Sequence, residues 1–137
     1  MGISDGDTIA VMHDGKAEKV RLNGIDCPEN GQAFGQRAKQ LASELVFNKT
    51  VLVKEFGKDR YGQTIGDVVL NEDVILNHQL VGAGLCWWYC KYAPTNAVLE
   101  HLEMEAREAK RGLWVDAEPV PPWEWRHRQE AVRPSYQ

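Results

Sequence analysis

The sequence lacks the features that mark a membrane protein. Its longest apolar stretches, such as Val74–Leu76 and Leu85–Trp88, are far too short to cross a bilayer. Met1 is not followed by the charged start, apolar run and cleavage site of a leader peptide. We therefore expect no membrane partner, and a chain that is either cytosolic or made from a precursor whose leader has been cut away. We also expect a monomer.

Cysteine and positive charge are both scarce. The three cysteines, Cys27, Cys86 and Cys90, leave at least one thiol unpaired and argue against a disulfide framework. No CxxC pair or His–Cys cluster is present, so zinc is not expected. The 16 Lys and Arg residues against 20 Asp and Glu give a formal net charge of −4. That balance disfavours a broad electrostatic binder of phosphates, but not an enzyme that concentrates a few cations in one cleft.

What is present fits one domain of 137 residues with mixed elements. Asp14-Gly15, a favoured hairpin turn, separates two segments with the alternation typical of strands. Further elements follow from apolar periodicity and turn residues. The expected strands are Ile9–Met12, Lys19–Leu22, Thr50–Phe56, Thr64–Leu70 and Leu85–Tyr89. The expected helices are Gln36–Phe47, Val74–Ala83 and a last one that starts at Thr95 or Asn96 and ends at Gly112.

The last helix has a clear apolar stripe in the sequence. Its predicted buried residues are Val98, Leu99, Leu102, Ala106 and Ala109. Glu103 and Arg107, four residues apart, are expected as an ion pair on its solvated face. A tail rich in proline and tryptophan follows and is expected to wrap the body. A hairpin, further strands and inserted helices together suit a small closed barrel with helical caps.

One group of residues suggests chemistry. Asp5 and Asp7 open the first hairpin strand, Arg21 lies on the returning strand, and Asp26 and Glu29 follow directly. The hairpin would bring these carboxylates and the guanidinium into one pocket. Hard oxygen ligands of this kind suit Ca²⁺ or Mg²⁺. Each signal has a plainer reading as a capped turn, a solvated arginine or loop acids, so the order and spacing of the whole set carry the hypothesis.

These motifs resemble the signature of the staphylococcal nuclease family. The set is Asp5-Gly-Asp-Thr8, Val20-Arg-Leu22, Gly24-Ile-Asp-x-Pro-Glu29, Asp59-Arg-Tyr-Gly62, Leu80-Val-x-x-Gly-Leu85, Tyr92-x-Pro94 and Gly112-Leu-Trp114. It spans about residues 3 to 115, and the tail Pro121-Pro-Trp-Glu-Trp-Arg126 is also similar to bacterial members. The resemblance implies an α+β fold, a five-stranded OB-fold barrel with about three helices. It places a nuclease-like domain at residues 1–115 and a tail at residues 116–137 that packs on the domain or trails from it.

The resemblance also implies a function and a site. It implies Ca²⁺-dependent hydrolysis of phosphodiester bonds in single-stranded or unpaired DNA or RNA. Asp7 and Asp26 match metal-binding aspartates, and Asp5 matches an acid that supports the metal site. Glu29 matches the proposed general base, and Arg21 matches one of two arginines that grip the phosphate and stabilise a phosphorane-like transition state. Tyr61 and Tyr92 match residues near the bound nucleotide.

The chain departs from the family pattern at Gln63. The second phosphate-binding arginine of the family stands there, and glutamine brings no charge and no fork of donors. Weakened cleavage, or none, is therefore expected. The alternative is a non-catalytic nucleic-acid-binding module, which Gln63 favours and the retained Asp7, Arg21, Asp26 and Glu29 disfavour. A third reading, a protein-interaction domain that uses the tail, has only the tail in its support. The resemblance suggests an extracellular or periplasmic location.

Overall fold

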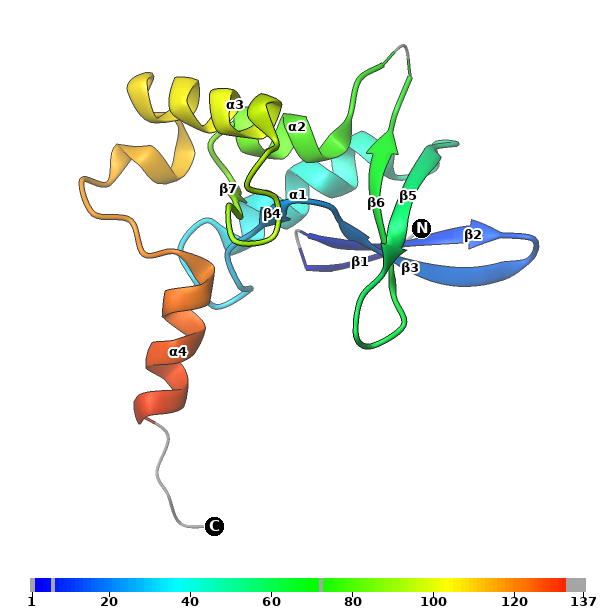
Figure 1. Ribbon diagram of the computed structural model, residues 1–137, viewed down its shortest axis with the longest axis horizontal. Coiled ribbons are helices and arrows are strands. Elements are labelled where there is room, and N and C mark those ends of the chain that lie inside the picture. Colours follow the sequence, from blue (N-terminus) through cyan, green and yellow to red (C-terminus); the bar gives the residue numbers. More distant parts are fainter. Residues whose placement is uncertain (1, 6, 72, 133–137) are drawn as a thin grey trace.

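The computed structural model describes residues 2–5, 7–71 and 73–132, and the side chains of residues 7–71 and 73–128. Its main sheet has five strands in the order β1-β2-β3-β6-β5 (Figure 1). β3 and β6 are parallel, and the other neighbours are antiparallel. The strands are β1 (Gly2–Asp5), β2 (Thr8–His13), β3 (Lys16–Leu22), β5 (Leu52–Lys58) and β6 (Thr64–Val69). A separate two-stranded sheet pairs β4 (Ile25–Asp26) with β7 (Trp87–Trp88).

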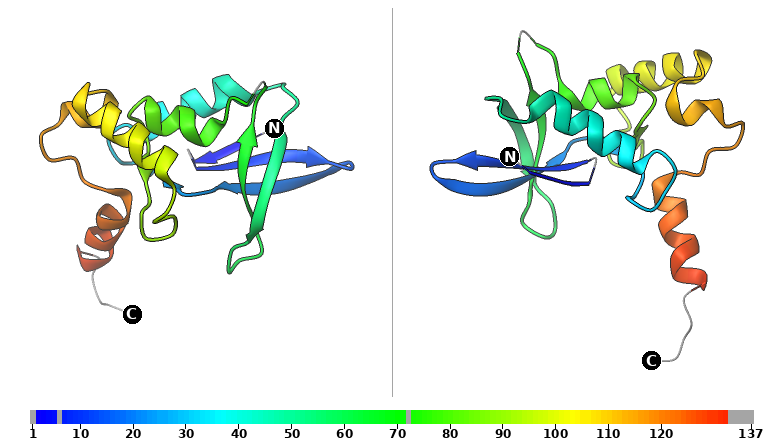
Figure 2. Two further views of the ribbon diagram at one scale, coloured as in Figure 1. Left: turned by 45° about the horizontal axis from the view of Figure 1, so that its top comes forward. Right: turned by 180° about the vertical axis from the view of Figure 1, so that it is seen from behind.

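Helices cover one side of the main sheet (Figure 1). They are α1 (Gly35–Val46), α2 (Leu76–Gly82) and α3 (Ala97–Glu108), followed by a short 3₁₀ turn, η1 (Gly112–Val115). Helix α4 (Pro122–Val132) lies at the far end of the molecule from the tip of the β2–β3 hairpin in both views of Figure 2. Within the described residues, no helix has the length and apolar character needed to span a bilayer.

The α+β class is confirmed, each of the five expected segments contains a strand, and the arrangement is OB-like. The expected strand Leu85–Tyr89 supplies β7 of the small sheet, and the fifth strand of the main sheet is β1, which was not among the expected strands. The barrel is not closed, because β1 and β5 remain the two edges of the sheet over the described ranges. The tail contains a helix that the sequence interpretation did not include. Helix α4 begins with Pro122 in its first turn, where a missing N–H costs nothing and the fixed φ of proline suits the helix.

The β2–β3 hairpin forms as predicted. Asp14 and Gly15 both have positive φ, at 51° and 78°, which is the backbone that a tight two-residue hairpin turn requires. The strands pair from His13 with Lys16 to Thr8 with Arg21. This register turns one face of the hairpin into the core, where Ile9 and Val20 are buried.

Helix α3 corrects part of the predicted stripe. Leu99 and Ala106 are buried as expected, but Val98 and Ala109 are exposed. Glu103, predicted on the solvated face, is only 7% exposed. It lies in reach of Arg107, whose guanidinium lies 4.2 Å from the Trp114 ring centroid. The prediction was wrong because η1 folds back against α3 and covers that face, a long-range contact that helical spacing does not show.

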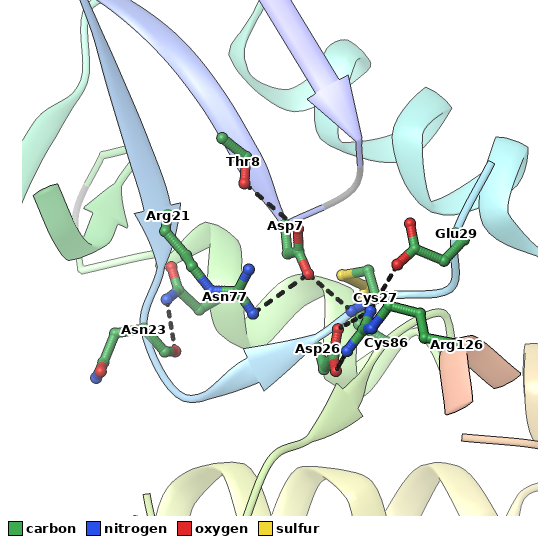
Figure 3. Close-up of polar contacts among 10 residues, drawn as sticks. All are labelled: Asp7, Thr8, Arg21, Asn23, Asp26, Cys27, Glu29, Asn77, Cys86 and Arg126. Carbon is green, nitrogen blue, oxygen red and sulfur yellow. Dashed lines mark hydrogen bonds and ion pairs between the residues drawn. A yellow bond between two sulfur atoms is a disulfide. The ribbon is translucent and has the colours of Figure 1, made fainter. Parts of the chain in front are cut away.

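Asn77 joins three elements from a fully buried position on α2. Its side-chain amide donates to the carbonyl oxygens of Asn23 (3.0 Å) and Gly66 (3.3 Å) and to the carboxylate of Asp67 (3.1 Å). Its oxygen accepts from the N–H of Val68 at 3.2 Å. These bonds hold the turn between β3 and β4 against β6, and Figure 3 draws the bond to Asn23. They therefore fix the short segment that separates Arg21 from Asp26.

Replacing Asn77 by alanine should destabilise the fold strongly. The change leaves several buried backbone groups without partners, and we expect a loss on the order of 3 kcal/mol in the free energy of unfolding. Urea unfolding followed by circular dichroism measures it. Gln79→Ala, on the same helix, serves as the control. An Asn77→Ala variant as stable as this control would show that the buried bonds are dispensable.

Burial of Glu103 predicts a pH dependence. Burial raises the pKa of the Glu103 carboxyl, and the neighbouring Arg107 only partly opposes this. The folded chain therefore holds the proton more tightly than the unfolded chain, so the contribution of Glu103 to stability falls as the pH rises through about 4.5 and beyond. Unfolding free energies of the parent chain and Glu103→Gln, measured from pH 4 to pH 7, should show the parent losing stability relative to the variant. A constant difference would contradict this.

Candidate active site

The β2–β3 hairpin places Asp7 and Arg21 side by side. Thr8 pairs with Arg21, and the N–H of Leu22 donates to the carbonyl oxygen of Asp7 at 2.8 Å. The Arg21 guanidinium lies 3.7 Å from Oδ2 of Asp7, which is 5% exposed (Figure 3). A buried carboxylate is thus held at the end of β2 with a cation at its edge.

Asp26 lies at the end of β4, fully buried, next to Asp7. The backbone N–H of Cys27 donates to Asp7 Oδ2 at 3.3 Å, so the segment that carries Asp26 is tied directly to the Asp7 carboxylate. β4 pairs with β7 through Ile25 with Trp88 and Asp26 with Trp87. Asp26 is therefore positioned by the small two-stranded sheet and not by the main sheet that carries Arg21.

The same pairing produces a disulfide between Cys27 and Cys86. The antiparallel register, continued by one residue past Asp26 and Trp87, brings these two cysteines opposite each other. Cys90 is exposed with a free thiol, so the expected unpaired thiol is confirmed. The argument against a disulfide framework missed this bond, because an odd count cannot show that two cysteines 59 residues apart meet.

Glu29 is held by the loop that precedes α1. Its N–H donates to the side-chain oxygen of Gln32 at 3.2 Å, and its carbonyl accepts from the N–H of Gln32 at 2.9 Å. Gly35 packs against the Glu29 carbonyl so closely that a Cβ there would overlap it. The side chain of Glu29 is 30% exposed, so its carboxylate can reach both the cluster and water.

Arg126 of helix α4 completes the cluster, and the sequence interpretation did not assign it a role. Its Nη1 donates to Glu29 Oε1 and its Nη2 to Asp26 Oδ2, both at 2.6 Å (Figure 3). Burial lowers the pKa of Arg126, but the bonds to the two carboxylates outweigh this and leave the pKa above its ordinary value. The only sequence signal was its place at the end of the Pro-Pro-Trp-Glu-Trp-Arg motif.

Aromatic side chains fix the start of α4 on the body. Trp123 stacks on Tyr89, with ring centroids 4.9 Å apart and planes 7° apart, and meets Trp87 edge-on at 5.5 Å. The side-chain amide of Gln32 donates to the carbonyl of Val120 at 2.6 Å. Burial, followed by the nearby Tyr92 and Asp26, raises the pKa of the Tyr89 hydroxyl above its ordinary value. The bond between Gln32 and Val120 therefore joins the loop that holds Glu29 to the segment just before α4.

The cluster fits a hard cation in its donor chemistry. Asp7 and Asp26 offer buried carboxylate oxygens, which suit Ca²⁺ or Mg²⁺. The contacts to Asp7 from Thr8 (3.4 Å), Cys27 (3.3 Å) and Arg21 (3.7 Å) are all long, so its oxygens are only loosely engaged. Among the described residues, no three His, Cys, Asp or Glu side chains form a ready metal cage. A cation here would take its other ligands from water, backbone carbonyls or a bound phosphate.

The other residues that the sequence predicted for the site lie apart from the carboxylate cluster, except Asp5, whose side chain is not among those the structure describes. Tyr61 is 75% exposed on the β5–β6 turn, where Arg60 lies over its ring. Tyr92 is 71% exposed and packs edge-on against Tyr89, close to the foot of α4. Gln63 follows the turn, and its N–H donates to the Asp59 carboxylate at 2.9 Å. The side chain of Asp5 lies outside the described residues.

Comparison with known proteins gives a consistent result. The family model described as "Staphylococcal nuclease homologue" matches residues 19–116. An "Uncharacterized endonuclease" of Escherichia coli is 47% identical over 127 residues, which cover 93% of this chain and 82% of that protein. The "Micrococcal nuclease" of Shigella flexneri is 41% identical over 90% of this chain and 76% of its own length. A staphylococcal-like nuclease of Arabidopsis thaliana is 36% identical over 81% of this chain and 34% of its own length.

Loss of the Cys27–Cys86 disulfide should destabilise the chain. Opening a loop of 59 residues frees the unfolded chain, and the chain-entropy estimate for that length is about 4 kcal/mol. We expect Cys86→Ser to lower the melting temperature clearly and Cys90→Ser, which removes the exposed thiol, to leave it unchanged. Differential scanning calorimetry measures both. Equal melting temperatures for the two variants would show that the bond contributes nothing.

Proposed function

The chain belongs to the staphylococcal nuclease family, and we propose that it hydrolyses phosphodiester bonds in DNA or RNA in a Ca²⁺-dependent reaction. The observation that carries this proposal is the clustering of Asp7, Arg21, Asp26 and Glu29 at one spot, from three separate segments of the chain. A protein that only bound nucleic acid would gain nothing from acids facing a phosphate.

In the proposed reaction Glu29 is the general base. Its partial exposure supports this role, because the attacking water must come from solvent. Arg21 would donate hydrogen bonds to the phosphate and stabilise the charge of the phosphorane-like transition state. Asp7 and Asp26, with Asp5 through water, would hold Ca²⁺, which when bound supplies charge neutralisation at the phosphate. The long contacts around Asp7 support its availability as a ligand.

The substrate would be single-stranded or unpaired nucleic acid. Tyr61 and Tyr92 are exposed aromatic residues, and their rings could stack on bases at two places on the surface. We further propose that residues 1–115 form the nuclease domain, and that the protein acts as a monomer. The Cys27–Cys86 disulfide supports an extracellular or periplasmic location, since such bonds persist in oxidising compartments.

Gln63 is the observation that favours the second candidate function. Without a charged side chain at this position, the chain could bind nucleic acid as a nuclease-like module that does not cleave. Both functions use Arg21 and the exposed tyrosines. The two functions differ at Glu29, which acts as the general base in the nuclease and has no catalytic role in the binding module.

Cleavage of labelled single-stranded DNA in Ca²⁺ and in chelator tests the proposal. We expect cleavage only with Ca²⁺, and we expect Glu29→Gln to slow it on the order of 10²–10⁴-fold because the base is lost. Glu44→Gln, an exposed acid on α1, is the matched control and should cleave at the parent rate. Binding of the DNA without cleavage by the parent chain would instead support the module.

A further inference from the structure

We propose that Arg126 is a second phosphate-binding arginine of this site and supplies, from the tail helix, the positive charge that Gln63 lacks. This inference rests on the proposed nuclease function. Two observations support it: the position after Tyr61-Gly62 carries no charge, and the Arg126 guanidinium, from near the C-terminus, lies on Asp26 and Glu29.

The placement of Arg126 is built into the fold. Trp123, three residues earlier, is stacked on Tyr89 and meets Trp87, and Pro122 is buried. The Trp125 ring lies against Gly31, in the same loop that holds Glu29. With these anchors just before it in the chain, Arg126 lies in the first turns of α4 with its guanidinium on Asp26 and Glu29 (Figure 3).

Arg126 and a metal ion would use different oxygens. The short bonds of Arg126 engage Asp26 Oδ2 and Glu29 Oε1, whereas its contact with Asp26 Oδ1 is 3.4 Å, too long for a strong charge-assisted bond. Asp26 Oδ1 and the loosely engaged Asp7 carboxylate therefore remain for a cation. The guanidinium can stay in place beside the ion.

The charges explain why a second guanidinium is needed. Counting the described side chains alone, Asp7, Asp26 and Glu29 against Arg21 and Arg126 leave one net negative charge, and a divalent cation would change this sum to one positive charge. Without Arg126 the site would carry one positive charge less and would attract a phosphodiester more weakly. The Arg126 side chain is 40% exposed, so part of its fork of donors faces solvent and can meet a phosphate oxygen.

Substitution at residue 126, combined with residue 63, tests the proposal. We expect Arg126→Gln to lower kcat/KM for single-stranded DNA at saturating Ca²⁺ by about 10²-fold or more. Calcium binding, measured by calorimetry without substrate, should be unchanged or tighter, because a neighbouring cation has been removed. Gln63→Arg should change the parent by less than about threefold and should recover at least about tenfold of the loss in the double variant.

Arg128→Gln is the matched control, since Arg128 lies on the same helix and pairs with Glu124 away from the cluster. It should retain the parent activity, and melting temperatures should show that all variants fold. Three results would overturn the assignment: Arg126→Gln within about threefold of the parent, faster cleavage with tighter calcium binding, or a double variant as slow as Arg126→Gln. In each of these the parent still cleaves, so the nuclease function stands. A parent chain that does not cleave would remove both proposals.

Discussion

The pairing of β4 with β7 is the interaction on which the site depends. These two-residue strands lie outside the main sheet, yet their register sets Asp26 opposite Trp87 and brings Cys27 to Cys86. Trp87 in turn packs with Ala106, Leu113 and Trp114 in a small hydrophobic cluster beside the main core, and Tyr89, just beyond β7, stacks on Trp123. The positions of the Asp26 carboxylate and of Trp123, which anchors α4, therefore both depend on the pairing of β4 with β7. So short a pair of strands can hold this position because the Cys27–Cys86 disulfide lies at its end, and because the main core and the small cluster around Trp87 pack against it.

The part of the fold that could be predicted from the sequence is the part that local physics determines. The hairpin follows from Asp14-Gly15 and the alternation around it, and its return beside Arg21 follows from strand pairing. What failed depends on distant packing. Glu103 is buried because η1 folds over α3, and α4 was missed because its prolines suggested an extended tail. The roles of Asp7 and Asp26 came from a resemblance between motifs, since spacing alone left plainer readings open.

The net negative charge of the chain is offset locally at the site by two arginines. A net charge of −4 is unfavourable for a protein that meets a polyanion, and three clustered carboxylates add to that cost. Arg21 and Arg126 offset most of it locally, each in contact with a buried aspartate. The two arginines thus neutralise most of the negative charge of the carboxylates without a metal ion. The fold can therefore keep these carboxylates together when no metal is bound.

The site draws on both ends of the chain. The family model matches residues 19–116, whereas Asp7 precedes that span and Arg126 follows it. The span matched by the family model supplies the frame, and the segments on either side of it supply Asp7 and Arg126, which carry charges of opposite sign. The charge of the site can therefore be changed by substitutions in these two flanking segments, without altering the buried side chains of the core.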